Sequence, residues 1–364
     1  MMMNKKTSVL FAALLGATLL VTACEQPKNA GTPQKSNAPL GIKKPTIGFS
    51  VCCEKGLVAT IDQFVEGVEK EADKQKGKLL QLVANEDAPQ EKADLQFEQV
   101  KQMIDKGAKS VIVIFVSNRS AAENQEKILK YAEEKNVMIV AGRRAVPKKL
   151  FAQFNNLYSV GVSPEVLGMR QGKMVVDQWK AHPEWDSNED KKMSFAVLRG
   201  PQGATQAESR ITNSLNTIRK DDQMTSSEQV ASENSSWKRE DAKRVVAKWI
   251  KSGVLDKAEV IVANSDELAL GAVDALKEAN KPLLPIFGIN ASQDGLAAVQ
   301  NNELIGTVLP DSDTMGALTY QVAENLASGK SVDASMPANY QFKGSRTINV
   351  QPIVVTKENV NQFR

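Results

Sequence analysis

A twofold alternation of short apolar segments with amphipathic segments constrains the fold of this chain more than any other feature. Apolar runs of this length are typical of strands that are buried on both faces of a parallel sheet, and the amphipathic patterns between them fit connecting helices. In the first series, we expect strands at residues 46–51, 78–83, 110–116 and 137–141, with helices such as 63–75 and 91–106.

The same pattern begins again in the second half of the chain. There we expect strands at residues 194–199, 228–231, 259–263 and 284–289, with helices at 204–220, 238–252 and 267–279. Two consecutive doubly wound α/β units are therefore the simplest architecture. Ligands of such sheets bind outside the carboxyl ends of the strands, so two lobes that face each other would enclose a ligand cleft lined by strand-end loops.

The amino terminus predicts export. Two lysines precede an apolar run at 9–21, which is shorter than the roughly 20 residues that a membrane-spanning helix needs. The sequence LLVTAC places small residues directly before Cys24, as in the signal peptides of bacterial lipoproteins. We therefore expect residues 1–23 to be a signal peptide and Cys24 to carry the lipid that anchors the protein to a bacterial membrane, facing the periplasm or the cell surface. The alternative is an ordinary signal peptide followed by a chance cysteine.

The segment 24–44 predicts a flexible tether. It is rich in Pro, Asn, Gln, Ser, Gly and Lys and has almost nothing to bury, so it cannot offset the entropy lost on ordering. The remaining length of about 320 residues favours two domains over one. The formal net charge of +3 is small, and no basic stretch is interleaved with aromatic residues, so nucleic acid is not an expected partner.

Four segments carry a resemblance to a known family. They are IVANSDELALGAVDALKEANK at 261–281, PIFGINASQDGLAAVQNNELIGTVLPD at 285–311, YSVGVSPEVLGMRQGKMV at 158–175 and LRGPQGATQAESR at 198–210. They resemble the periplasmic galactose/glucose-binding proteins, within the wider ribose-binding-like family of ABC-transporter receptors. The resemblance covers the whole chain after the tether and implies a periplasmic binding protein fold of type 1.

What the resemblance implies about organisation is specific. It implies two lobes joined by three crossovers, which we expect near Gly142, Leu309 and Ile348. The lobes would then comprise residues 45–142 plus 310–347 and residues 143–309 plus 348–364. It also implies a monomer that closes on one small molecule, usually a sugar, and then docks on an ABC permease or a chemoreceptor.

Two of the family's ligand contacts are retained. Trp237 matches the aromatic residue that stacks on a sugar, and Arg210 matches the arginine that hydrogen-bonds the ring and hydroxyl oxygens. An indole face suits the C–H side of a pyranose, and a guanidinium presents several fixed donors. Without the resemblance, the alternatives are core packing for Trp237 and a solvated helix charge for Arg210.

The other contact positions depart from the family. Phe115 stands in place of a contact Asn, Ala204 and Gln206 in place of His and Asp, Ser265 in place of Asn, Asn290 in place of Asp and Pro310 in place of a hinge Asn. Each buried group that loses its partner costs about 1–3 kcal/mol, so we expect weak binding of glucose and galactose. The altered site is more electropositive and suits a ligand with a carboxylate, or a modified or less hydroxylated sugar.

A second pattern resembles the calcium loop of the galactose-binding proteins. In DSNEDKKMS, oxygen donors recur at the one-three-five spacing of an EF-hand, followed by a backbone carbonyl and a further side-chain oxygen, with a distant glutamate as bidentate ligand. Lys191 replaces the usual glycine, so a lysine ammonium in place of the ion, or a plain solvated turn, is the alternative. The expected ligands are Asp186, Asn188, Asp190, Lys192, Ser194 and Glu259.

No catalytic set is found in the sequence. His182 is the only histidine and lies in AHPEW, which is typical of a surface helix end. The adjacent Cys52 and Cys53 form no CxxC motif; they are compatible with a vicinal disulfide, an intermolecular pair or reduced thiols. We therefore expect a binding protein and not an enzyme. A surface recognition or chemosensory protein with a non-sugar ligand is the alternative to transport.

Overall fold

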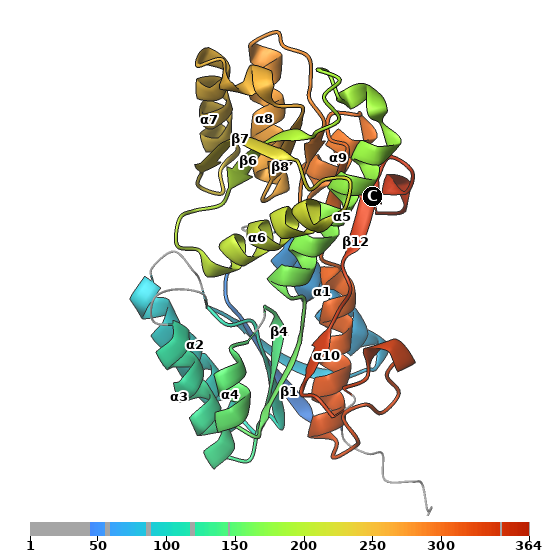
Figure 1. The fold of residues 1–364 in the computed structure, drawn as a ribbon. Coiled ribbons are helices and arrows are strands. Elements are labelled where there is room, and N and C mark those ends of the chain that lie inside the picture. The colour runs from blue at the N-terminus through green and yellow to red at the C-terminus, as the bar shows by residue number, and fades with distance from the viewer. Residues whose placement is uncertain are drawn as a thin grey trace, which may run out of the picture. The chain divides into compact units, whose positions relative to one another are not determined.

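Two six-stranded sheets organise the part of the chain that the structure describes (Figure 1). The computed structural model describes residues 44–54, 59–84, 89–116, 121–144, 146–342 and 344–363. The predicted signal peptide 1–23, the lipidated Cys24 and the tether up to residue 43 lie outside the described residues. Residues 44–364 form one compact unit. No helix within the described ranges combines the length and the apolar character that crossing a membrane requires.

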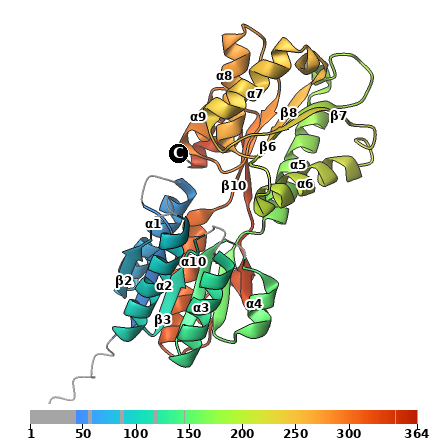
Figure 2. The ribbon, with the colours of Figure 1, turned by 90° about the vertical axis from the view of Figure 1, so that its left-hand side faces the viewer.

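The first sheet is parallel throughout, in the order β11-β5-β4-β3-β1-β2. Helices α1 and α10 pack against each other on one side of it, and α2 packs on α3 on the other (Figures 1 and 2). Its strands are β1 Thr46–Val51, β2 Lys78–Val83, β3 Ser110–Val113, β4 Met138–Arg143, β5 Leu157–Gly161 and β11 Thr347–Asn349. The helices are α1 Ala59–Lys74, α2 Pro89–Asp105, α3 Ala121–Glu134, α4 Lys148–Gln153 and α10 Ser312–Ala327.

The second sheet has the order β12-β10-β9-β8-β6-β7 and is parallel except for β12, which runs antiparallel to β10. Helix α5 packs on α6, and α7 packs on α8. The strands are β6 Ser194–Arg199, β7 Glu228–Asn234, β8 Val260–Ala263, β9 Ile286–Phe287, β10 Gly306–Leu309 and β12 Ile353–Thr356. The helices are α5 Pro164–Ala181, α6 Thr205–Lys220, α7 Arg239–Lys251, α8 Asp266–Glu278 and α9 Gln293–Gln300. Short 3-10 helices lie at Pro183–Trp185, Val254–Lys257, Ala338–Tyr340 and Val360–Phe363.

The central strands are buried on both faces, as the apolar runs predict. Every residue of β3 and β8 is buried, because each strand lies between two other strands and has helices on both sides of its sheet. The expected α/β fold with two doubly wound, mainly parallel sheets is therefore confirmed.

Strand pairing shows where the chain changes sheet. It passes from β5 into α5, returns from β10 into α10, and passes from β11 into β12. The first change differs from the boundary expected near Gly142, because β5 pairs with β4 and keeps residues 157–161 in the first sheet. Ile348 lies within β11 and pairs with Val160, so the last change of sheet follows Asn349. The division of the chain into two lobes that enclose a ligand remains a prediction.

Candidate ligand-binding site

Trp237 and Arg210 lie together at the carboxyl end of the second sheet. Trp237 follows β7, and its ring lies close to the backbone of Gly200, where an added Cβ would come within 2.4 Å of the indole. The guanidinium carbon of Arg210 lies 5.6 Å from the centre of the same ring, within the range of a cation–π contact. Trp237 remains 40% exposed, so part of the residue is available to a ligand.

A close helix pair positions Arg210. Helix α6 approaches α5 at Gly168, where a Cβ would lie 2.0 Å from the carbonyl oxygen of Arg210, so only glycine allows this spacing. Asn264, which follows β8, donates from Nδ2 to the carbonyl of Ala207 at 3.0 Å and fixes the first turn of α6. Arg210 is therefore carried on a helix that is fixed to both the neighbouring helix and the sheet.

The guanidinium of Arg210 is poorly satisfied. Nη1 donates to Oδ1 of Asn290 at a long 3.4 Å. Nε is buried without a hydrogen-bond partner. Burial lowers the pKa of Arg210 to about 10, and the nearby Asp266 carboxylate opposes this shift. The group therefore stays positively charged at neutral pH.

Asn290 and Asp266 lie near the guanidinium of Arg210. Asn290 follows β9 with φ of 116°, an unusual backbone conformation that its N–H bond to the carbonyl of Val308 supports. Asp266 is fully buried and accepts hydrogen bonds from Thr307 Oγ1 at 2.6 Å and from the Ser292 N–H at 2.7 Å. Burial raises the pKa of Asp266 to about 6, although these bonds favour the ionised form. Nothing in the local sequence pattern around Asp266 or Thr307 marks either residue as part of the site.

The remaining expected contact residues have different surroundings. Ser265 is buried and caps α8 by accepting the N–H of Leu268 at 3.4 Å. Gln206 is exposed in the first turn of α6. Phe115 is buried in a hydrophobic cluster of the first sheet, and its carbonyl accepts a bond from Arg144 at 3.1 Å. The structure thus groups Trp237 and Arg210 with Asn290, and the ligand roles of all six expected residues remain predictions.

In the loop 186–194, side-chain oxygens accept hydrogen bonds from backbone N–H groups of the same loop. Asp186 accepts the N–H groups of Asp190 at 3.2 Å and Lys191 at 2.9 Å, and Asn188 accepts the N–H of Asp190 at 2.9 Å. Lys191 has a φ of 62°, so it adopts the left-handed turn for which the family uses glycine. The sequence spacing therefore produces a turn of the expected kind.

Glu259 holds this loop against the sheet. Its buried carboxylate accepts the N–H of Ser187 at 2.9 Å and the N–H of Ser194 at 3.0 Å, while Asp190 accepts the N–H of Lys192 at 2.8 Å. Within the described ranges, no three His, Cys, Asp or Glu side chains gather closely enough to hold a metal ion. The oxygen donors expected for calcium are thus of the right kind, but their carboxylates do not converge in this structure.

Two other features of the sequence take ordinary positions. Cys52 and Cys53 follow β1, are buried and form no disulfide; their Sγ atoms are 3.4 Å apart. His182 stacks on Trp185 with 4.4 Å between ring centres and contacts Glu184 at 2.8 Å, as a surface residue at a helix end.

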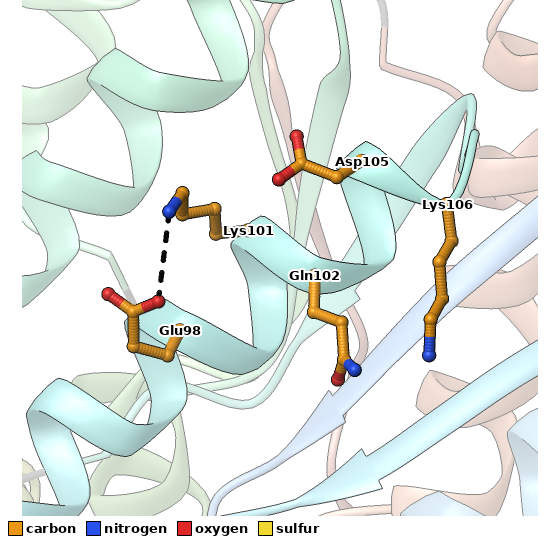
Figure 3. Close-up of a pocket in the computed structure, with 5 residues that line it drawn as sticks. All are labelled: Glu98, Lys101, Gln102, Asp105 and Lys106. Carbon is orange, nitrogen blue, oxygen red and sulfur yellow. Dashed lines mark ion pairs between the residues drawn. The ribbon is translucent and has the colours of Figure 1, made fainter.

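A surface hollow on α2 is separate from this group of residues. It is lined by Glu98, Lys101, Gln102, Asp105 and Lys106 (Figure 3). Glu98 and Lys101 form an exposed ion pair 3.9 Å apart, which contributes little stability. Because the lining comes from the last turns of one helix and is mainly charged, this hollow is a solvated helix surface.

Two mainly parallel α/β sheets joined by three crossovers define a class of protein, the periplasmic binding proteins of type 1. A model of the periplasmic binding protein domain matches residues 58–331, and the chain belongs to this family. It is similar to the D-galactose/methyl-galactoside binding periplasmic protein MglB of Haemophilus influenzae, with 32% identity over 304 residues, 83% of this chain and 88% of the relative. It also resembles a xylitol-binding protein of Mycolicibacterium smegmatis, with 26% identity over 83% of this chain and 75% of the relative.

A solved structure agrees on the fold. An ABC transporter solute-binding protein from Bacillus halodurans with bound myo-inositol superposes with a TM-score of 0.67 at 22% identity, over 88% of this chain and 97% of that chain. Members of this family are extracytoplasmic binding proteins, which agrees with the expectation of a binding protein and not an enzyme.

Proposed function

We propose that this protein is the solute-binding component of an ABC importer and that it binds a sugar or a polyol between two lobes. The observation that carries the proposal is the pair formed by Trp237 and Arg210, which combines an exposed aromatic surface with a charged group rich in donors. Relatives named for galactose, xylitol and myo-inositol support the same ligand class. A cyclic polyol has both an apolar C–H face and hydroxyl groups, so it matches both halves of this pair.

Closure on the ligand completes the proposed mechanism. The chain crosses between the sheets three times, and short crossovers of this kind allow two rigid sheets to rotate as bodies about a hinge. In our proposal, Trp237 and Arg210 bind first, and Ser265, Gln206, Asn290 and the region of Phe115 surround the ligand on closure. The closed monomer then docks on a membrane permease, and a chemoreceptor is a further partner.

Intrinsic fluorescence tests the binding proposal. The chain has four tryptophans, of which Trp179 and Trp249 are buried. A panel of neutral hexoses, pentitols, inositols and sugar acids should include at least one compound that changes the emission of the parent. Trp237→Phe should remove most of that change, whereas Trp249→Phe should keep it. A panel in which no carbohydrate alters emission or raises the melting temperature would contradict the proposal.

We also propose that the protein is a lipoprotein. The support is the LLVTAC sequence with Cys24, followed by a segment suited to a tether. The parent should incorporate labelled fatty acid and partition into detergent, and Cys24→Ser should do neither. Processing that is insensitive to globomycin would contradict the lipid anchor.

For the loop 186–194 we propose a structural calcium ion with no part in ligand recognition. The support is the oxygen donor set and the left-handed turn at Lys191. Asp186, Asn188, Asp190 and Ser194 would supply oxygens together with Glu259 and the carbonyl of Lys192. Since the carboxylates do not converge in this structure, the ion would have to draw them together, and a chelator then lowers the melting temperature.

A further inference from the structure

The positive charge of Arg210 has no bonded counter-ion among the described residues. Its one hydrogen bond runs to the neutral amide of Asn290, and its buried Nε has no partner. Taking a charge out of water is costly unless an opposite charge and further hydrogen bonds compensate for it. The structure therefore leaves a partly desolvated cation beside the exposed surface of Trp237.

Asp266 does not fill this role. Its field acts on Arg210, but its carboxylate bonds Thr307 and the N–H of Ser292, and no hydrogen bond or ion pair joins it to the guanidinium. Its own burial favours the protonated form. The hydrogen bonds of Asp266 are thus made to Thr307 and Ser292 and not to Arg210.

Two other acidic residues near the first turns of α6, Glu208 and Glu165, also have partners other than Arg210. Glu208 pairs with Arg199 at 3.0 Å. Glu165 on α5 accepts hydrogen bonds from the hydroxyls of Ser163 at 2.7 Å and Ser209 at 2.6 Å. Neither carboxylate is bonded to Arg210.

We propose that the ligand supplies the missing charge, so that this protein binds a carboxylated sugar or polyol, such as a uronate or an aldonate. This rests on the proposed function and specifies its substrate class. The carboxylate lies against the guanidinium, while the C–H face of the ligand packs on Trp237. With Nη1 directed to Asn290, Nη2 is the nitrogen left to donate to a ligand carboxylate, and a bidentate pair would require closure to bring the buried Nε into contact with it as well.

Asn290 sets this preference. An aspartate at this position would place a carboxylate at the atom that now accepts the bond from Nη1, and it would neutralise the guanidinium from within the protein. A ligand carboxylate would then gain less from the neutralised guanidinium and would be repelled by the aspartate, so neutral ligands would be favoured. The amide at Asn290 keeps the cation open to an acidic ligand.

Calorimetry with galacturonate, glucuronate and gluconate against galactose, glucose and myo-inositol tests the proposal. In the parent, at least one acid should bind tenfold or more tightly than the neutral compound of the same skeleton. Asn290→Asp should weaken that acid at least tenfold without weakening the neutral compounds. Asn216→Asp, which adds the same charge on an exposed part of α6, should leave the preference unchanged.

A second variant tests the proposal independently in case Asn290→Asp does not fold. Arg210→Gln should abolish the preference for acids while thermal unfolding remains cooperative. Neutral compounds that bind the parent as tightly as the acids would overturn the inference and leave the proposed function standing. An absence of binding by every acid and every neutral carbohydrate would overturn both.

Discussion

The backbone of Gly200 and the indole of Trp237 approach so closely that an added Cβ would lie 2.4 Å from the ring. The glycine thus fixes the depth at which the ring sits beside Arg210. Gly200 follows β6 and Trp237 follows β7, so the contact joins the ends of two neighbouring strands. The orientation of the indole therefore depends on a residue that carries no side chain.

Gly200→Ala should therefore weaken ligand binding through the ring. The new methyl group must displace the indole, and we expect a loss of about tenfold in affinity for whichever carbohydrate binds the parent, roughly 1.4 kcal/mol. Calorimetry measures it. In a Trp237→Ala background the same change should have little further effect, because the two residues act as one unit. Additive losses would contradict this coupling.

Arg210→Ala should weaken binding by about 2 kcal/mol or more, because a charged, partly buried donor group is lost against the ligand. Lys220→Ala removes one cation from the exposed end of the same helix and should leave affinity within twofold of the parent. Equal affinity of the Arg210→Ala variant and the parent would exclude a role for the guanidinium in binding.

Asp266 should make stability depend on pH. Its folded pKa of about 6 lies above the ordinary value of 3.8, so the folded state holds the proton more tightly than the unfolded state. The free energy of unfolding should therefore fall as the pH rises from about 4 to 6, by on the order of 3 kcal/mol from this group. Urea unfolding at several pH values measures the fall, and Asp266→Asn should reduce it.

Thr307→Val provides the matched variant for this test. The hydroxyl of Thr307 donates to the Asp266 carboxylate and lowers its pKa, so removing it should raise that pKa and move the fall in stability to higher pH. An unchanged profile in both variants would show that Asp266 does not contribute to the pH dependence.

Glu259 should couple calcium to stability. A chelator should lower the melting temperature of the parent, because an ion that binds only the folded state stabilises it by mass action. Glu259→Gln should remove this difference and also destabilise the metal-free protein, since the carboxylate accepts the N–H groups of Ser187 and Ser194. A melting temperature that does not respond to the chelator in the parent would exclude calcium.

Cys52 and Cys53 should be protected thiols. Both are buried and form no disulfide, so iodoacetamide should label them slowly in the native protein and fully after unfolding. Peptide mass spectrometry reads the labelling. A peptide that is two hydrogens lighter and unlabelled after unfolding would instead reveal a vicinal disulfide.

The sequence predicts the central part of the fold because the inner strands are continuous apolar runs. The expected segments 46–51 and 194–199 coincide with the inner strands β1 and β6, and the segment 78–83 coincides with the edge strand β2. The strand β5 was missed as a separate element because it follows α4, a helix of only six residues, and its pairing with β4 depends on tertiary contacts. The crossover that the resemblance implies near Gly142 therefore precedes β5, which still belongs to the first sheet.

The candidate site could be predicted only in part. The resemblance identified Trp237 and Arg210, which the structure brings together. Other features depend on how distant segments pack: the hydrogen bond from Thr307 to Asp266, the capping role of Ser265 and the burial of Phe115. No local pattern carries that information.

Native mass spectrometry of the freshly purified protein tests the central claim most directly, because a closed binding protein retains a tight ligand through gentle purification. We expect a complex whose added mass corresponds to one carbohydrate. Mild denaturation should release this ligand from the parent, and the Arg210→Ala variant should be purified without it. An added mass that belongs to a non-carbohydrate ligand would contradict the account, as would an unliganded protein that binds none of the sugars, polyols or sugar acids when they are added back.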